Sequence, residues 1–313
     1  MINYEIRRII NTIPIIFIVL TLVFFIIRLM PGDPATAVLG DYASKEAVNA
    51  LREQMGLNRP IMVQYFSYLI DIVRLDFGKS LIHNIPVSDR IFSVLPYSLM
   101  LTFSGIFIGY LFGIPLGIYA AIHRNSFIDY FNRVFSLIGL SVPAFFLGII
   151  LILIFSIQFN FFPIVGGGDF SNILNVLHHL FLPALTLGLI MTAYVTRLTR
   201  SSFLEILRED YVRTAESKGL NNRTVMYKHA LRNALIPIVS LGGLYAVGLI
   251  GSSVMVEIVF SRPGLGTLLV AATKQRDYTT LQSLMVFFTI IVVILNLFTD
   301  LVYSLIDPRI KHN

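Results

Sequence analysis

The residues with the clearest chemical spacing are Gly78, Lys79 and Ser80, which match the end of a phosphate-binding loop. In the motif GxxxxGK(S/T), backbone amides and the lysine hold the phosphates of a nucleotide. The first glycine of that motif would be residue 73, which is Val73, and no buried strand is expected before it. We therefore expect no nucleotide site on this chain.

A histidine pair and a glycine run are the next candidates, for a metal ion or a phosphate. His178 and His179 are adjacent, and neighbours on a helix do not face the same way. No third ligand is near them in sequence, so we expect a loop or interface role. The three glycines 166–168 precede Asp169 without a helix signal, which predicts a turn and no phosphate cradle. The chain has no cysteine, which excludes thiol catalysis, disulfides and cysteine-ligated metal.

Carboxylates inside apolar segments are the remaining candidates. Asp300 lies well inside an apolar run, four residues after Asn296, where packing near a helix end is the simplest role. Glu257 lies at the end of another run. It could contact substrate or a partner, be solvated at the membrane rim, or pair with Arg262. The apolar runs contain no Ser/His pair, paired aspartates or HExxH, so a membrane enzyme is disfavoured and we predict a non-catalytic chain.

The elements that must position these residues are membrane helices. Of the 313 residues, 56% are apolar and 13% charged, and the mean hydropathy is +0.77. Charged residues make up about a quarter of an ordinary globular chain, so we predict an all-α integral membrane protein. Runs of membrane-crossing length are expected at 9–27, 95–122, 134–158, 183–203, 235–260 and 281–306.

Three of these spans have special features. The fourth has an apolar stretch of only 183–196, so it must extend to about residue 203, with Arg197 and Arg200 snorkelling to the interface. Pro143 predicts a kink within the third. Glycines at every fourth position of the second, and several in the fifth, predict close helix packing; they are Gly105, Gly109, Gly113 and Gly117, then Gly242, Gly243, Gly248 and Gly251.

The first apolar run has a rival interpretation as a signal peptide. Residues 35–37 (ATA) resemble a cleavage site, but the run is longer than a usual signal core and the sequence PGDP intervenes. We therefore expect an uncleaved span. The polar region after it, residues 31–94, is expected to hold two amphipathic helices, at 41–57 and 60–75.

The segment 209–233, between the fourth and fifth runs, carries most of the chain's clustered charge. In this segment and the residues leading into it, apolar positions recur at helical steps, at Leu204, Leu207, Tyr211 and Ala215. Gly219 then breaks the pattern, as a helix-ending glycine does, and Asn221 can cap a second short helix through Val225 and Leu231. This predicts a bent pair of short helices suited to docking into a soluble partner.

The residue order in this segment resembles a known motif. Thr214, Ala215 and Gly219, followed by HALRN at 229–233, are similar to the EAA loop of ABC-importer permeases of the dipeptide/oligopeptide/nickel branch. The general motif has Glu at the position of Arg213 and Ala at that of Thr214, departures typical of this branch. The signature VEIVFSRPGLG at 256–266, the closing DPR at 307–309 and the pattern of the polar region resemble the same branch. An ordinary basic loop would explain the charges but not this order.

The resemblance implies an all-α fold of six transmembrane helices of the type I ABC-importer kind, with a helical extracytoplasmic insert between helices 1 and 2. The expected domains are a first helix at 1–30, the insert at 31–94, a permease core at 95–306 with a coupling loop at 201–233, and a tail at 307–313. The residues implied in coupling to the ATPase are Glu209, Asp210, Tyr211, Arg213, Thr214, Ala215, Lys218, Gly219, His229, Arg232 and Asn233. Those implied in the outer gate, substrate path or partner contact are Glu257, Phe260, Pro263, Gly264 and Gly266.

The resemblance also implies partners. They are a second homologous permease subunit, two cytoplasmic ATPase subunits that bind ATP and Mg, and an extracytoplasmic substrate-binding protein. No cofactor or metal is expected on this chain, and no nucleic acid. Of the 24 Lys and Arg residues, 14 lie in segments that would be cytoplasmic if both termini were inside, as the positive-inside rule favours for a bacterial or archaeal cell membrane.

Two alternatives remain open at this stage. The solute implied first is a di- or oligopeptide, with a nickel or metallophore complex or glutathione as other members of the branch. A different class, an ion-coupled secondary transporter, would be expected to show internal repeats and ionisable groups at mid-membrane, and the sequence has little of either.

Overall fold

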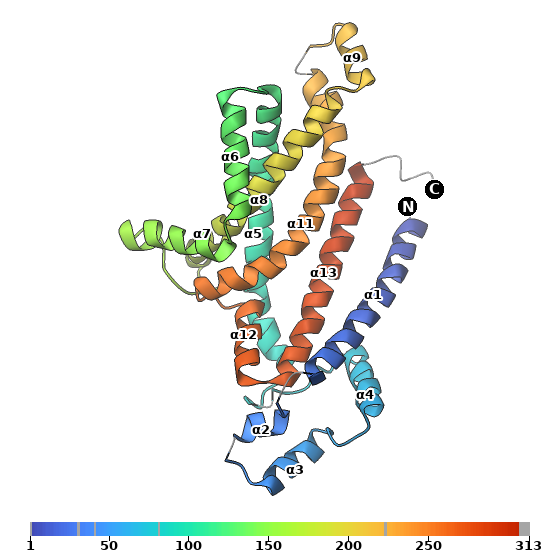
Figure 1. Ribbon diagram of the computed structural model, residues 1–313, viewed down its shortest axis with the longest axis vertical. Coiled ribbons are helices and arrows are strands. Elements are labelled where there is room, and N and C mark those ends of the chain that lie inside the picture. Colours follow the sequence, from blue (N-terminus) through green and yellow to red (C-terminus); the bar gives the residue numbers. More distant parts are fainter. Residues whose placement is uncertain (1, 30–31, 41, 81, 222–223, 307–313) are drawn as a thin grey trace. The chain divides into compact units, whose positions relative to one another are not determined.

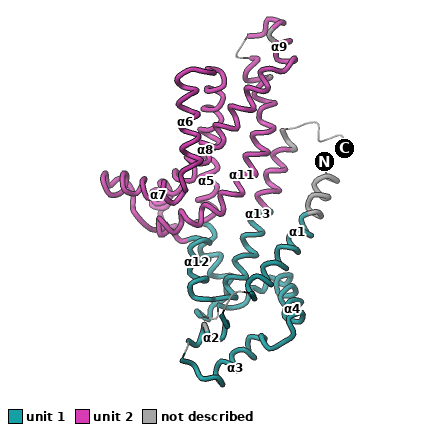
Figure 2. The backbone as a smooth tube through the Cα atoms, viewed as in Figure 1, with its two compact units in different colours: residues 1–96, 264–293 teal, residues 97–263, 294–313 magenta. Residues whose placement is uncertain are grey.

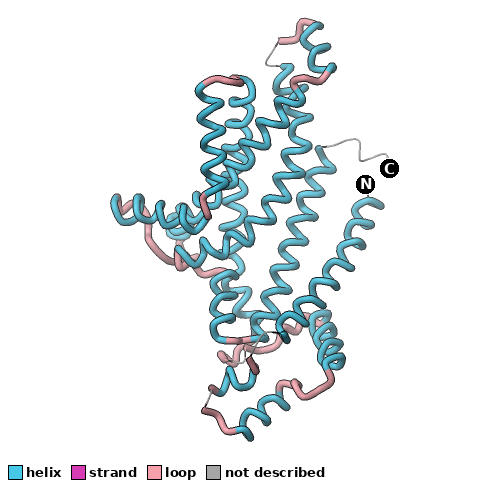
Figure 3. Tube along the Cα trace, viewed as in Figure 1, coloured by secondary structure: helices cyan, strands magenta, loops and turns pink. Residues whose placement is uncertain are grey.

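The computed structural model (Figure 1) describes residues 2–29, 32–40, 42–80, 82–221 and 224–306, with side chains for all of these except 2–11, 37, 216, 229 and 304–306. Within those ranges the regular structure is helical, as Figure 3 shows, and the only β feature is an isolated bridge between Lys79 and Pro86. The predicted all-α class is confirmed.

The chain divides into two compact units, 1–96 with 264–293 and 97–263 with 294–313 (Figure 2). The first unit holds α1 (Ile2–Leu29), α2 (Pro34–Leu39), α3 (Lys45–Gln54), α4 (Ile61–Val73), the start of α5 (Val87–Ile122), α12 (Leu265–Gln275) and most of α13 (Tyr278–Ile306). The second holds the rest of α5 and α13, with α6 (Phe127–Ser141), α7 (Ala144–Leu151), η1 (Ile152–Gln158), α8 (Ile173–Ile206), α9 (Asp210–Ser217), η2 (Val225–Ala230) and α11 (Leu231–Val259).

Five helices in the described ranges are long and apolar enough to cross a membrane. They are Thr12–Leu29, Val87–Ile122, Ile173–Ile206, Val225–Val259 and Tyr278–Tyr303. A sixth span exists if the bent pair Phe127–Ser141 and Ala144–Gln158 is taken as one. The prediction of a polytopic helical membrane protein is confirmed.

The third predicted span is more sharply broken than a proline kink. Its two halves meet at 106°. Val142, which precedes Pro143, is extended (φ −83°, ψ 124°), and Pro143 itself lies at ψ 142° as the N-cap of α7. Because a proline ring disfavours the helical conformation in the residue before it, and Val142 is extended here, α6 ends there and α7 starts in a new direction. The expectation of one kinked helix across 134–158 was therefore wrong.

The fourth span begins ten residues earlier than predicted. Asn172 caps α8 by accepting hydrogen bonds from the amides of residues 174 and 175, at 3.1 and 3.3 Å. Pro183, expected at the start of the helix, lies inside it. His178 and His179 are thus helical, not in a loop, and each is bonded to a backbone carbonyl, of Phe161 (2.8 Å) and of residue 175 (2.9 Å). The start of α8 is therefore set by its N-cap Asn172, three helical turns before the apolar stretch begins.

The glycine stripe of α5 packs closely on another helix, as predicted, and the structure shows that this helix is α8. Each glycine faces one residue of a matching four-residue ladder, so a Cβ built on it would fall closer than van der Waals contact allows. The facing pairs are Gly105 with Leu187, Gly109 with Met191, Gly113 with Val195 and Gly117 with Thr199. In α11, Gly242 and Gly243 are equally tight, whereas Gly248 and Gly251 have no described atom within 4 Å of such a Cβ. Packing within this chain therefore explains only half of the predicted α11 positions.

In the first unit, Asp277 organises the turn before α13. Its fully buried carboxylate accepts hydrogen bonds from the hydroxyls of Ser80 and Thr280, both at 2.6 Å, and Arg90 lies 3.4 Å away. Ser80, the last residue of the Gly-Lys-Ser triplet, thus has a structural role as a hydrogen-bond donor to Asp277. The apolar core of this unit joins α1, α5, α12 and α13 through residues such as Ile27, Ile91 and Leu284.

Candidate functional site

The charged segment begins with a break that the periodicity did not predict. α8 ends at Ile206, and the amides of Arg208 and Glu209 bond back to the carbonyls of residues 205 and 206, both at 3.1 Å, which forms a turn. α9 then starts at Asp210, whose carboxylate suits the positive end of the helix dipole. The first of the two predicted short helices is α9, and this turn separates it from α8, although the apolar periodicity continues from Leu204 to Ala215.

A small apolar core holds α9 in place. Val212 and Val225 are fully buried and Ala215 nearly so, and Ile206 and Leu207 pack against them. These residues come from the end of α8, from α9 and from η2. Because apolar contact joins all three elements, α9 is fixed to the ends of two long helices and is not a loose loop.

The polar side chains of this segment point outward. Asn233 donates a hydrogen bond of 2.8 Å from its amide nitrogen to the hydroxyl oxygen of Tyr211, which links α9 to α11. The hydroxyl of Thr214 donates to the carbonyl of residue 210, also at 2.8 Å. The side chain of His229 lies outside the described set. The predicted coupling residues that are exposed are Glu209, Asp210, Tyr211, Arg213, Thr214, Lys218, Gly219, Arg232 and Asn233.

Gly219 ends α9 as predicted. Its φ is +76°, in the left-handed region where glycine has no Cβ penalty. A Cβ built there would meet no described atom within 4 Å, so the backbone angle, not space, requires glycine. The helix after it differs from the prediction, because η2 runs directly into α11 as one helix over Val225–Val259. Residues 222 and 223, next to the proposed cap Asn221, lie outside the described residues.

A buried ion pair near this segment was missed by the sequence reasoning. Asp129 on α6 is fully buried, and Arg200 on α8 donates to both of its oxygens, at 2.5 and 2.9 Å. Arg133 lies 3.3 Å from the same carboxylate. Arg200 was expected to snorkel to the interface, and it is instead held by this pair. The sequence did contain one local signal for a helix start at this place. Ser126 caps α6, and Asp129 follows it three residues later, which is the spacing of a helix N-cap pattern.

The predicted outer residues form a second, buried group. Glu257 is 1% exposed, and Ser98 on α5 donates a hydrogen bond of 2.5 Å to its carboxylate. Arg262 is also fully buried, with its guanidinium 5.3 Å from the ring centre of Tyr97. Burial lowers the pKa of Arg262 to about 10, and the nearby charge of Glu257 works against that shift. Of the three roles open for Glu257, the solvated rim group is therefore wrong, and electrostatic pairing with Arg262 is supported.

This group also holds the glycine run 166–168. The amide of Gly166 donates to the carbonyl of Phe260 at 3.0 Å, and Arg262 approaches the carbonyl of Gly167 at 3.5 Å. Gly166 has φ +104°, but no turn is assigned to the glycine run 166–168 itself; the turn follows at Asp169, whose carbonyl accepts a hydrogen bond of 2.9 Å from the amide of Asn172. Phe260 and Arg262, both in the segment 256–266, thus connect this segment to the glycines 166–168 by hydrogen bonds.

The remaining outer residues differ in their surroundings. Phe260 lies in the main apolar core of the second unit, and Pro263 is half-buried at its end. Gly264 and Gly266 are buried at the start of α12, in the first unit. A role of these residues in a gate or substrate path stays a prediction. Among the described residues, no three His, Cys, Asp or Glu side chains gather in a metal-binding cluster.

Comparison with known proteins agrees with this architecture. The family model described as "Binding-protein-dependent transport system inner membrane component" matches residues 113–312, and the model of its N-terminal region matches residues 1–102. Glutathione transport system permease protein GsiC of Escherichia coli (strain K12) and that of Salmonella typhimurium are each 39% identical over 312 residues, covering 100% of both chains.

Solved structures share the fold. A chain of the inward-facing MetNI methionine ABC transporter superposes with a TM-score of 0.56 at 19% identity, covering 69% of this chain and 96% of that one. An amino acid ABC transporter with histidines gives a TM-score of 0.51 at 16% identity, covering 69% and 94%. Two family models that together cover nearly the whole chain, and full-length relatives, lead to one conclusion: the chain belongs to the family of binding-protein-dependent transport system inner-membrane components and is a multi-pass permease of an ABC importer.

Proposed function

We propose that this chain forms half of a translocation pathway with a second, similar permease subunit, and that α9 docks into a separate ATPase subunit. ATP and Mg would be bound by the ATPase partners, and this chain would contribute no catalytic group. The observation that carries the proposal is the construction of α9. Its apolar side is anchored by Val212 and Ala215, and its charged side is exposed.

The same construction supports a lever mechanism. α8 has 34 residues, which is about 51 Å at 1.5 Å per residue, and the helix after α9 has 35. A movement imposed on α9 when ATP closes the ATPase subunits passes into both helices through the shared core. The Asp129–Arg200 ion pair couples α6 to the same movement. The pathway would then alternate between its two openings by rigid-body motion.

The proposed orientation places both termini and the coupling loop, residues 201–233, in the cytoplasm. The support is the distribution of Lys and Arg residues. The insert at 31–94 would then lie outside the cell membrane, where a binding protein delivers the solute.

The solute is proposed to be a short peptide. The full-length relatives are named for glutathione, which is a tripeptide, and they are 39% identical to this chain. Selectivity would rest largely with the binding protein. Competition of unlabelled glutathione and dipeptides against labelled glutathione uptake, in vesicles that hold the assembled transporter, tests this assignment. Failure of every peptide to compete would reject it.

The coupling role is tested by uncoupling variants of the assembled transporter. Arg213→Glu reverses a charge on the exposed side of α9, and Gly219→Pro imposes φ near −65° on a residue at +76°. We expect both to reduce solute uptake per ATP hydrolysed by about tenfold or more, within the range typical of coupling between two sites, while membrane insertion survives. Matched controls are Arg124→Glu, an exposed arginine elsewhere, and Gly219→Asn, since Asn tolerates this backbone region. Unchanged uptake in the two test variants would refute the coupling assignment.

A further inference from the structure

Helix α4 has an exposed apolar stripe that neither the pathway nor the coupling loop uses. Its 13 residues are too few to cross a bilayer, a length typical of buried or interfacial helices. Four apolar side chains at helical spacing are half or more exposed; they are Met62 (56%), Phe66 (59%), Ile70 (50%) and Val73 (83%). The stripe carries no charge.

A second side of α4 packs on a membrane span. Tyr65 is buried, its hydroxyl lies 2.7 Å from that of Thr21, and its ring meets Phe24 edge-on with centroids 5.2 Å apart. Arg28 donates a hydrogen bond of 3.2 Å to Gln64. Thr21 is eight residues before the end of the span Thr12–Leu29, which is about 12 Å along the helix. The contact therefore reaches well inside the segment of α1 that the bilayer must cover.

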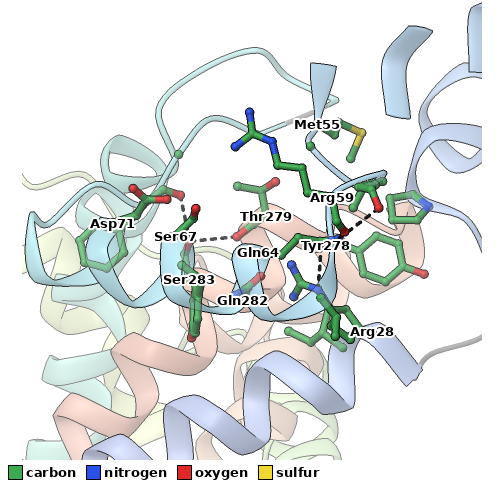
Figure 4. Close-up of a pocket in the computed structure, with 18 of the residues that line it drawn as sticks. Arg28, Met55, Arg59, Gln64, Ser67, Asp71, Tyr278, Thr279, Gln282 and Ser283 are labelled. Atoms are coloured by element: carbon green, nitrogen blue, oxygen red, sulfur yellow. Dashed lines mark hydrogen bonds between the residues drawn. The ribbon is translucent and has the colours of Figure 1, made fainter. Parts of the chain in front are cut away.

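A third face of α4 is polar. Figure 4 shows Gln64, Ser67 and Asp71 on one side of the helix, around a cavity of about 760 Å³ that Thr279 and Ser283 of α13 also line. α4 thus separates its polar side chains from its apolar stripe.

We infer that α4 is a membrane-interface helix, with the stripe Met62, Phe66, Ile70 and Val73 inserted among the acyl chains of the leaflet at the C-terminal end of α1. Amphipathic helices of this kind lie with the apolar face a few ångströms below the headgroups. The occupant is lipid because α4 packs against α1 eight residues inside a span that the bilayer must cover, so the uncharged stripe lies beside the membrane. On α1, the exposed residues Ile18, Leu22, Ile26 and Leu29 recur at helical spacing about a third of a turn from the side that contacts α4, so this span also has an apolar face uncovered by the chain's described side chains.

The neighbouring helix α3 supplies the contrast. It carries charged residues and, among the described side chains, buries none. Its sequence gives no stripe comparable to that of α4, so the interfacial position belongs to α4 and not to the polar region as a whole.

The absence of cysteine from the chain makes the test direct. Single cysteines at Phe66 and Ile70 are spin-labelled in the assembled transporter in proteoliposomes, with Leu22 as the membrane reference and Asn49 of α3 as the aqueous control. Collisions with oxygen, which concentrates in lipid, are compared with collisions with nickel-EDDA, which stays in water. We expect oxygen to dominate at Phe66 and Ile70, as at Leu22, and nickel-EDDA to dominate at Asn49.

Two results would overturn the inference. Dominant nickel-EDDA collisions at Phe66 and Ile70 would place the stripe in water, and shielding from both reagents would place it under a protein partner. A label at Ser67, on the polar face, should collide with oxygen several-fold less than one at Phe66, and equal values would contradict the orientation. Each of these failures would leave the importer assignment intact, because that assignment uses no residue of α4.

Discussion

The close approach of α5 and α8 predicts that one added methyl group destabilises the permease. In Gly117→Ala, the new Cβ would lie 2.7 Å from the carbonyl oxygen of Thr196 and 2.5 Å from the Cβ of Thr199. Ordinary contact begins at 3.4 Å, so these distances are 0.7 and 0.9 Å too short. One of the two obstacles is backbone and the other is the first side-chain carbon. Neither can rotate away, so the helices must separate.

The magnitude follows from two opposing effects. Replacing glycine by alanine in a helix favours the helix by about 1 kcal/mol. Overpacking a well-packed contact disfavours the fold by about 1–3 kcal/mol. Because the obstacles at Gly117 are rigid, we expect the upper part of that range and a net loss of about 1–2 kcal/mol.

The assay is thermal unfolding of the purified transporter in one detergent, compared with Gly248→Ala on α11. A Cβ at Gly248 meets no described atom within 4 Å, so this control gains the helix preference and meets no obstacle within the chain. We expect a Tm lowered by several degrees for Gly117→Ala and an equal or raised Tm for Gly248→Ala. Equal Tm values for the two variants would refute the close-packing argument.

Three further predictions concern polar contacts. Asp129→Asn leaves Arg200 without its charged partner, and since breaking a buried ion pair costs about 3–5 kcal/mol, the Tm of the transporter should fall clearly; an unchanged Tm would contradict this. Tyr211→Phe removes the acceptor for Asn233, which should lower uptake per ATP with assembly intact, and normal coupling would show that the bond does not hold α9. Glu257→Gln keeps the shape but removes the charge beside a buried arginine, so unfolding should occur at lower temperature, and a variant as stable as the parent would speak against that pairing.

Local chemistry in the sequence was enough for most of the membrane helices and some of their boundaries. Apolar runs of membrane length predicted the spans because a bilayer permits little but helices there. The four-residue glycine spacing of α5 predicted a close contact, and the structure identifies α8 as the partner. The helix end at Gly219 was predictable because glycine, which has no Cβ, takes a positive φ at little cost.

Tertiary structure alone decided what depends on distant partners. Glu257 meets Ser98 across 159 residues and Arg200 meets Asp129 across 71, and no periodicity encodes such pairs. The same holds for the turn after Ile206, which breaks a continuous helical pattern so that Val212 can share a core with Val225. A sequence pattern shows the conformational preference of each segment by itself. Which side chains become buried, and the free energy gained by burying them, depend on contacts between segments that are distant in the sequence.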